Sequence, residues 1–407
     1  MTRPTHSFLS HLLAYGASEA AAKLSRLGVV IVVARTLDVT EIGLAAAALA
    51  TGDLLKSLTE NGIGQRIVAA PEAELDATCN RAHGLFTAWC LGLFTLQCGL
   101  ASGIWAVTGN AALAGMIALL GAEYLFMPAG LVQVALALRA GKMHRTAAIA
   151  GGQAVCANLA SVLLAFVIPS ALALVLPRLL SAPVWLIAVR RLHPWQARPE
   201  AGLAPIRPFA HFGAPILGTE LVRTARLHAD KLLIGALLGP EMLGLYFLAF
   251  NAGLSLATSF STAFAAVLFP HLCARTDRAE ALRQGIGLSV GLVAPVVIAQ
   301  SLLAPWYVPL LLGPGWEEVT TPVSILCMAA IPTMLWTATA GWLRAGMRPL
   351  EELRGTAILA AATLAGTALA APYGLTAIAW TYLATACCAM TVLSLPALRF
   401  ALLPEKA

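Results

Sequence analysis

Long apolar segments recur along the whole chain and are separated by short stretches rich in glycine, proline and charge. Their length predicts helical membrane spans, because about 20 apolar residues in an α-helix cross a hydrocarbon core of about 30 Å. A β-barrel would instead show alternating segments of about 10 residues, which do not occur here. The twelve predicted spans are residues 9–36, 41–61, 82–106, 111–138, 145–168, 171–190, 209–238, 241–268, 284–305, 319–343, 352–371 and 374–399.

The composition agrees with a chain that lies mostly in lipid. Hydrophobic residues make up 59% and charged residues only 11% of the sequence, with a mean hydropathy of +0.80. Soluble domains have about 25% charged residues. The net charge of +6 does not indicate a nucleic-acid partner, because the basic residues are spread over many short loops. We therefore expect an all-α polytopic membrane protein with about twelve transmembrane helices.

The distribution of lysine and arginine predicts the orientation of these spans. If the N-terminus is cytoplasmic, the inside segments hold 18 of the 26 basic residues and the outside loops hold only Arg35. This bias predicts that both termini are cytoplasmic. Glu19, Lys23 and Arg26 interrupt the first apolar segment, so we expect it to be a retained helix instead of a cleaved signal.

A connection rich in proline and arginine, HPWQARPEAGLAPIRP at 193–208, divides the chain nearly in half. It predicts an N-terminal six-helix bundle at 1–193, a cytoplasmic linker at 194–208 and a C-terminal six-helix bundle at 209–407. The halves begin alike: YGA at 15–17 resembles FGA at 212–214, and LDVTEIGL at 37–44 resembles LGPEMLGL at 238–245. With an even number of spans in each, such repeats run parallel and are expected to hold a substrate between them.

Charged residues within the spans gather on one side of three helices. A charged group that faces lipid costs at least about 2.5–3.5 kcal/mol at the helix centre, so we expect these stripes to face water or one another. At 100° per residue, the stripes cover arcs of roughly 60°, 60° and 140°. They consist of Glu19, Lys23 and Arg26; of Asp53, Lys56 and Glu60; and of Glu220, Arg223, Arg226, Asp230 and Lys231.

Cations outnumber anions within the spans, seven to five, with Glu60 near the cytoplasmic end. A surplus of fixed cations fits an anionic ligand, and the guanidinium fork fits phosphate oxygens in particular. The predicted substrate-binding residues of this cationic cavity are Arg26, Lys56, Arg223 and Arg226, with Lys23 in support. The repeat matches Arg26 with Arg223, which makes that pair the first to test.

A structural interpretation competes with this one. Glu19 with Lys23, and Arg226 with Asp230, are acid–base pairs at i,i+4 spacing that neutralise each other in a helix. Glu123 fits either a proton or sodium coupling site or a partner for a cation on a neighbouring helix. The predicted ion-coupling or gating residues are Glu123, Asp53 and Asp230.

Motifs of several other classes are absent from the sequence. It has no Walker A, GxSxG or HExxH motif and no cysteine–histidine metal spacing, so no catalytic residue, metal or cofactor is expected. The aromatic residues of the last third are expected at the membrane interfaces. They are Trp306, Tyr307, Trp316, Trp336 and Trp342.

Several motifs together resemble a known family. They are RLGVVIVVARTLDVTEIGLAAAA, ENGIGQRIV, DKLLIGALLGPEMLGLYFLAFN, LFPHLCARTDRAEAL and LLGPGWEEV, in this order over nearly the whole chain. This pattern is similar to the polysaccharide-biosynthesis, or O-antigen-type, flippase family of the multidrug/oligosaccharidyl-lipid/polysaccharide exporter superfamily. The resemblance implies two six-helix bundles, a cationic central cavity and alternating access. It also implies ion-coupled outward transport of an undecaprenyl-pyrophosphate-linked oligosaccharide across a bacterial inner membrane.

The expected function is therefore a flippase for a lipid-linked O-antigen, capsule or exopolysaccharide unit, with a glycan polymerase and a chain-length regulator as partners. A drug/ion antiporter of the same superfamily is the nearest competing function, but it would be expected to have an acid-dominated cavity. Two further functions stay open at this point: a membrane-embedded enzyme of glycan assembly and a non-transporting scaffold for a polysaccharide synthase.

Overall fold

The computed structural model describes residues 25–274, 277–313, 315–346 and 348–402. These ranges contain helices and connecting segments and no β-strand. Contacts group the chain into two compact units: one runs from Thr36 to Leu232, and the other joins residues up to Arg35 with those from Leu233 onward. We call the first the N-unit and the second the C-unit and describe each by itself.

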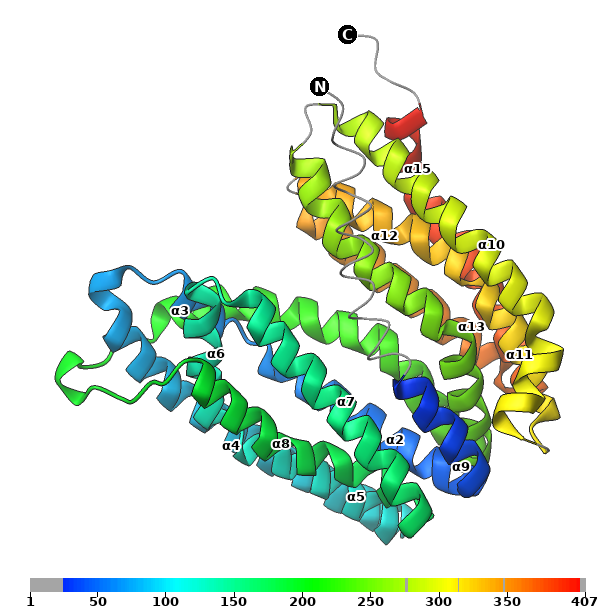
Figure 1. Cartoon of the computed structure of the whole chain (residues 1–407), viewed down its shortest axis with the longest axis horizontal. Helices are drawn as coiled ribbons and strands as arrows, with labels where there is room; N and C mark the ends of the chain where they lie inside the picture. Colours follow the sequence, from blue (N-terminus) through cyan, green and yellow to red (C-terminus); the bar gives the residue numbers. More distant parts are fainter. Residues whose placement is uncertain (1–24, 275–276, 314, 347, 403–407) are drawn as a thin grey trace. The chain divides into compact units, whose positions relative to one another are not determined.

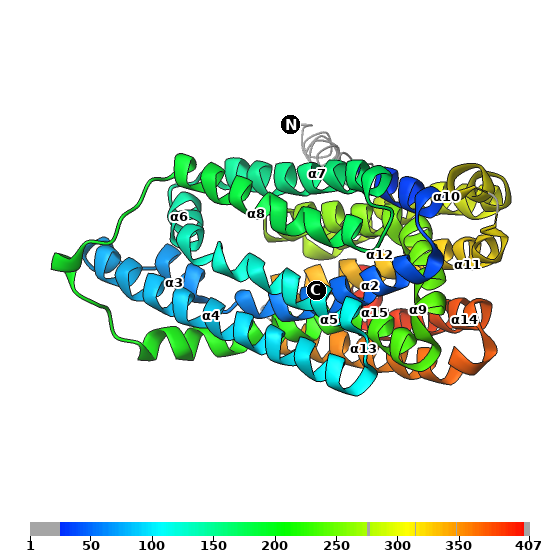
Figure 2. The ribbon, with the colours of Figure 1, turned by 90° about the horizontal axis from the view of Figure 1, so that it is seen from below.

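The N-unit consists of antiparallel helices whose short connections favour packing of neighbours. Figures 1 and 2 both show α7 beside α8, and α4 lies along α5. Its α-helices are α2 (Val39–Lys56), α3 (Ile63–Val68), α4 (Leu75–Thr108), α5 (Ala111–Gly121), α6 (Pro128–Arg139), α7 (Met143–Val167), α8 (Leu172–Leu192) and the first part of α9 (Arg207–Ala274). Short 3-10 turns lie at Ser57–Thr59, Glu72–Glu74, Ala122–Leu125 and Pro199–Ala201.

The C-unit contains helical residues 25–35, the second part of α9 and the six helices after it. Its core contacts join α10 to α11 and α12, and α14 to α11 and α13. The bounds are α10 (Arg278–Leu312), α11 (Glu317–Met328), α12 (Ala330–Ala345), α13 (Pro349–Ala370), α14 (Leu375–Thr385) and α15 (Thr391–Leu402), with a 3-10 turn at Ala371–Tyr373 and a π-helical turn at Ala386–Met390.

Each of the twelve predicted spans coincides with a helical segment, the first of them only over residues 25–36. By length and hydropathy, the described residues hold nine helices that can cross a membrane, or ten when the bent pair Ala111–Leu125 and Pro128–Arg139 counts as one span. The stretch after residue 304 extends the ninth span, because α10 continues to Leu312. The chain is thus a multi-pass α-helical membrane protein with about twelve spans.

The two copies of the repeated motif at 37–44 and 238–245 mark the same kind of break between consecutive spans. Asp38 precedes α2, and its carboxylate accepts a hydrogen bond from the Thr40 backbone N–H at 3.0 Å, as an N-cap residue does. In the second copy, Gly239 interrupts α9 with φ of 83° and ψ of 177°. Only glycine adopts such a backbone conformation without strain.

The segment that ends at Arg35 belongs to the C-unit because hydrogen bonds hold its end to α10 and α11. The Arg35 guanidinium donates to the carbonyl oxygens of Leu310 at 2.6 Å and Leu311 at 3.0 Å, at the end of α10. The indole N–H of Trp316 donates to the Ala34 carbonyl at 2.9 Å. These bonds satisfy carbonyl groups that a helix end leaves without partners, and they fix the end of the first helical segment to α10 and α11.

The start of α9 belongs to the N-unit because one glycine allows a close approach. A Cβ atom at Gly213 would lie 2.2 Å from the carbonyl oxygen of Asn61, in the turn before α3. Any larger residue would therefore push α9 away from that turn. Small residues are used in this way at helix interfaces in membranes, where they bring backbones close together.

The linker between the predicted halves is held against the start of α4. The Asn80 amide donates to the carbonyl oxygens of Arg198 at 2.7 Å and Gly202 at 3.0 Å and accepts from the Arg198 N–H at 3.1 Å. Arg81 donates to the Ala204 carbonyl at 2.7 Å, and the Arg198 guanidinium contacts Asp76 at 2.8 Å. The linker at 194–208 is therefore an ordered strap on the N-unit, and the predicted boundaries of the two halves stay a prediction.

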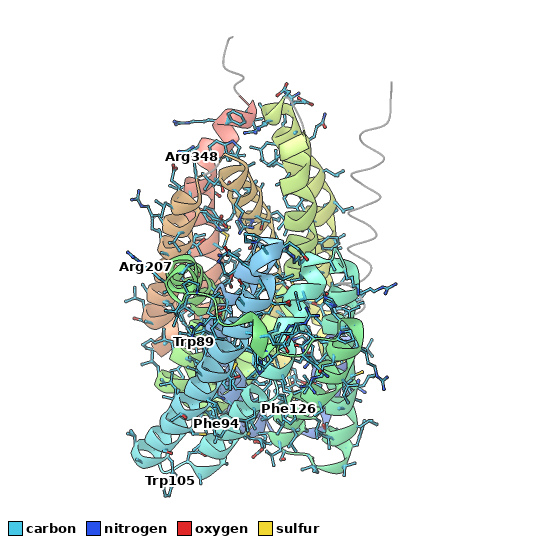
Figure 3. All side chains as sticks on the ribbon, turned by 90° about the vertical axis from the view of Figure 1, so that its left-hand side faces the viewer. Trp89, Phe94, Trp105, Phe126, Arg207 and Arg348 are labelled. Atoms are coloured by element: carbon cyan, nitrogen blue, oxygen red, sulfur yellow. The ribbon has the colours of Figure 1, made fainter. Side chains whose placement is uncertain are left out.

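Aromatic residues show where the sequence interpretation holds and where it fails. Figure 3 shows Trp89, Phe94 and Trp105 in succession along α4, with Trp105 at the far end, where it is exposed. Trp306 is 78% exposed, and its position at a membrane interface stays a prediction. The interfacial prediction is wrong for Trp316 and Trp336, which are buried in the C-unit. Trp336 packs against Gly355, where a Cβ would lie 2.3 Å from the indole ring.

Gly213→Ala is expected to lower the melting temperature of the purified protein, because overpacking costs about 1–3 kcal/mol. Gly218→Ala, one and a half turns further along α9, is the matched control, since nothing lies within 4 Å of its added Cβ. Equal melting temperatures for the two variants, measured by thermal unfolding in detergent, would contradict the close approach to Asn61.

Asn80→Ala is expected to free the linker strap. Because three hydrogen bonds are lost, hydrogen exchange of the backbone amides at 196–204 should accelerate by about tenfold or more. Thr95→Ala on the same helix is the control, since the Thr95 hydroxyl bonds only within α4. Unchanged exchange in both variants, measured by mass spectrometry, would show that the strap does not depend on Asn80.

Candidate functional site

A break in the fourth span positions the only acid of that span. The chain leaves α5 through a 3-10 turn at Ala122–Leu125 and enters α6 with Pro128 at its start, and the two segments meet at 55°. Proline at this position explains the bend, because it cannot donate the backbone hydrogen bond that would continue the helix. Glu123 therefore lies in a turn in the middle of a span, and its side chain is 9% exposed.

Glu123 forms an ion pair with Lys56 of α2. The Lys56 ammonium donates to the Glu123 carboxylate, and the Lys56 side chain is 33% exposed. Of the two sequence interpretations of Glu123, the structure therefore supplies the partner on a neighbouring helix. Its use in ion coupling stays a prediction, and so does the use of Lys56 in substrate binding.

A second ion pair lies one turn away on α2. The Arg178 guanidinium, from α8, donates to the Asp53 carboxylate, and their side chains are 27% and 26% exposed. The other carboxylate oxygen of Asp53 lies 3.8 Å from Nδ1 of His228 on α9. Four elements of the N-unit thus contribute to one network, which we call the charge frame: Asp53, Lys56, Glu123, Arg178 and His228.

The charge frame is balanced. Asp53 and Glu123 contribute two carboxylates, and Lys56 and Arg178 contribute two cationic groups, so each acid of the frame has a basic partner. Removing one partner of such a pair is expected to cost about 1.5–3 kcal/mol, because a charged hydrogen bond is lost. Each member therefore fixes the position of another helix.

The sequence contains a signal for this network in the depth of its lone charges. Asp53 and Glu123 each lie about 12 residues into a predicted span that runs in the same direction, so their depths in the membrane agree. Arg178 lies in a third span of that direction and has no acid within its own helix. Glu123 and Arg178 are lone charges in their spans, which indicates that each pairs with a group on another helix. His228 gives no such signal, because it falls outside the charged arc of its own helix.

Asp230 and Lys231 form a separate buried pair on α9. The Lys231 ammonium lies 3.2 Å from the Asp230 carboxylate and donates to the Leu227 carbonyl at 2.8 Å. Both residues are about 5% exposed, which makes them the most buried charges of this helix among the residues that the structure describes. A role of Asp230 in gating or coupling stays a prediction.

Arg26 lies in the C-unit, and Lys56 lies in the N-unit. Arg26 is exposed, and its Nε donates to the amide oxygen of Asn251 on α9 at 3.2 Å. Asn251 in turn donates to the Phe247 carbonyl at 2.8 Å. The predicted cavity residue Lys23 and the side chains of Arg223 and Arg226 lie outside the described residues.

Solved structures with the same fold are transporters and flippases. The chain superposes on "Lipid II flippase MurJ, inward closed conformation" with a TM-score of 0.78 and 11% identity, over 96% of this chain and 90% of that one. An inward-facing multidrug resistance MATE family transporter of the MOP superfamily gives 0.66 and 14%, over 95% and 94%. A MOP superfamily transporter from Pyrococcus furiosus gives 0.63 and 14%, over 97% and 95%. At these identities the likeness shows the fold alone.

Sequence comparison adds the biological context. The chain is 23% identical over 309 residues to "Lipopolysaccharide biosynthesis protein WzxC" of Escherichia coli (strain K12). The match covers 74% of this chain and 62% of the length of that relative. The family described as polysaccharide biosynthesis protein matches residues 32–321, which is most of the chain. Because this match spans more than two thirds of the sequence, the chain belongs to the polysaccharide biosynthesis protein family.

Proposed function

We propose that the protein carries a polyprenyl-pyrophosphate-linked oligosaccharide across a bacterial inner membrane by alternating access. The observation that supports this most directly is the charge frame. Its four ionised side chains lie in apolar spans, yet three of them keep a quarter to a third of their surface exposed. Charged groups in this position are too costly to face lipid, so they indicate a hydrated surface on the N-unit. A sugar head group needs such a surface to cross the membrane.

The second part of the proposal is that lysine and arginine side chains bind the pyrophosphate of the substrate. A pyrophosphate requires positive charge that is not consumed by acids of the protein, and guanidinium forks bind phosphate oxygens in pairs. In the sequence, cations within the spans outnumber anions seven to five, so positive charge remains even when every acid is paired. The proposal places the pyrophosphate near Arg26, Lys56, Arg223 and Arg226, with Lys23 in support. The glycan would be an O-antigen, capsule or exopolysaccharide unit.

The proposal includes ion coupling, orientation and partners. Glu123, Asp53 and Asp230 are the candidate coupling residues, and the imidazole of His228 lies beside Asp53. Both termini would be cytoplasmic, as the lysine and arginine bias predicts. A glycan polymerase and a chain-length regulator would act on the exported unit, and genes for them next to this one would support the assignment.

Arg26→Gln and Arg223→Gln are expected to reduce transport by about tenfold or more each, because a charge-assisted contact contributes about 1.5–3 kcal/mol. Glycan export in cells and flipping of a pyrophosphate-linked saccharide in proteoliposomes are the two measurements. Arg207→Gln, an exposed arginine at the start of α9, is the matched control and should transport normally. Unchanged export in both test variants, at equal expression, would contradict the site.

Transport of organic cations by the unmodified protein, without movement of the saccharide lipid, would favour the drug/ion antiporter instead. The same proteoliposomes distinguish the two functions, because both substrates are added under an imposed pH gradient. A chemical change in the saccharide lipid would indicate an enzyme of glycan assembly.

Paired substitutions separate a structural role of the charge frame from ion coupling. Arg178→Gln alone removes the guanidinium partner of Asp53 and is expected to lower stability by about 1.5–3 kcal/mol, the contribution of a charged hydrogen bond. The double variant D53N/R178Q should recover most of that stability, because two neutral amides need no counter-charge. If Asp53 couples an ion, the double variant should nevertheless lose the response of transport to the imposed gradient.

The surface pair Arg283–Glu280, on α10, provides the control for this experiment. E280Q/R283Q removes an exposed ion pair outside the charge frame and should leave both melting temperature and transport unchanged. A double variant D53N/R178Q that melts normally and still responds to the gradient would show that Asp53 has no part in coupling.

A further inference from the structure

A long part of the N-unit contains no acidic residue. From Tyr124 to Pro199 the sequence has no aspartate or glutamate, but it has seven lysine and arginine residues. This stretch comprises α6, α7 and α8 and the connections after them. Its positive charge can be balanced only by acids from elsewhere or by a ligand.

Three of the seven cations find acids in other segments. Arg139 contacts Glu72 at 2.9 Å, Arg178 pairs with Asp53, and Arg198 contacts Asp76 at 2.8 Å. The other four form no ion pair within the part of the chain that the structure describes. They are Lys142, Arg145, Arg190 and Arg191.

These four cations lie at one place, where α7 begins and α8 ends. The two helices are antiparallel neighbours (Figures 1 and 2). The Lys142 ammonium donates to the Leu192 carbonyl at 3.1 Å, which ties the two helix ends together. Arg190 donates through Nε to the Ala129 carbonyl at 3.1 Å, so its position is also fixed. Arg145 and Arg191 are exposed beside them. We call this group the basic patch.

Lys142 of the basic patch contributes to a lowered pKa of a neighbouring histidine. His193 follows α8, and burial together with the nearby Lys142 ammonium holds the pKa of its imidazole below the usual value. A positive charge disfavours a second one in its vicinity, so the site already has a positive potential. An anion would meet that potential without having to displace a carboxylate.

The basic patch lies at the end of an exposed apolar face of α8. Leu180, Val184 and Ile187 are exposed, and Arg191 continues their i,i+4,i+7 spacing onto the last turn. The helix thus presents apolar side chains along the membrane and a guanidinium at the end of the same face.

We propose that the basic patch is a seat for an anionic phospholipid of the leaflet at this end of α7 and α8. The acyl chains would lie along the apolar face of α8, and the head-group phosphate would contact Arg145, Arg190 and Arg191, with Lys142 at its side. Two features fit a phospholipid: negative charge at the depth of the helix ends, and hydrocarbon directly next to it. Basic surfaces between spans at the cytoplasmic side are known to bind anionic head groups.

The test measures binding of phosphatidylglycerol to the purified full-length protein in detergent by native mass spectrometry. Phosphatidylcholine with the same acyl chains is the reference lipid. Phosphatidylglycerol should bind more tightly to the unmodified protein. R145Q/R190Q/R191Q should weaken it by about fivefold per cation, and so by about a hundredfold in total.

A variant with the same change in net charge provides the control. R207Q/R354Q/R399Q removes three exposed arginines from three other helices and should keep the affinity of the unmodified protein. R145K/R190K/R191K keeps the charge and should retain most of the binding. Its melting temperature, with that of the glutamine variant, separates lost binding from lost folding.

Equal loss of binding in the R145Q/R190Q/R191Q and R207Q/R354Q/R399Q variants would show that only net charge matters and would overturn the proposal. Equal affinity of the unmodified protein for the two phospholipids would overturn it as well. Undecaprenyl pyrophosphate is tested in competition. If it displaces phosphatidylglycerol at equal concentration from the unmodified protein but not from R145Q/R190Q/R191Q, the patch is a substrate subsite instead. The outcome is independent of whether the protein transports a saccharide lipid.

Discussion

The fold depends on one constraint: a charge placed inside an apolar span must find its counter-charge within the bundle. In the N-unit this requirement joins α2 to the bent fourth span through Lys56 and Glu123, and to α8 through Asp53 and Arg178. Dispersion between apolar side chains does not distinguish helix from lipid, because both are hydrocarbon. The charge frame therefore specifies which helices are neighbours and at what depth, while small residues such as Gly52, against Leu120, set how closely they approach.

The two compact units do not follow the order of the sequence. The end of the first helical segment is held in the C-unit by Arg35, and the start of α9 is held in the N-unit by the contact of Gly213 with Asn61. Each unit thus includes a segment from the other half of the sequence. Each of these segments belongs to the first span of a predicted half, so the predicted repeat gives them matching places. The linker at 194–208 is also hydrogen-bonded to α4 of the N-unit, so this polar connection has a fixed position on that unit.

The sequence predicts the helices well because apolar length is a local property. The partners of the charges depend on packing between segments far apart in the chain. From the sequence alone, Lys56 on its charged helix face indicates an anion-binding site. In the structure Lys56 pairs with Glu123, which lies in a turn 67 residues further along the chain. Arg178 looks isolated in the sequence for the same reason. The interfacial prediction fails for Trp336 because tryptophan suits an interface and a buried contact equally well, and the space at Gly355 becomes visible only in three dimensions.

The separation of these partners along the chain has a consequence for biosynthesis. Asp53 and Arg178 are 125 residues apart, and the Glu41 carboxylate accepts from the N–H of Ala171, 130 residues away. At about 5–20 residues per second, the ribosome needs roughly 6 to 25 s to make the partner of an acid that has already been synthesised. During that interval α2 carries its acids without their final partners. Until then, the charged side chains of nascent α2 must stay in contact with water or with the insertion machinery. Lys56 is the first of them to gain its partner, when the fourth span brings Glu123 to it.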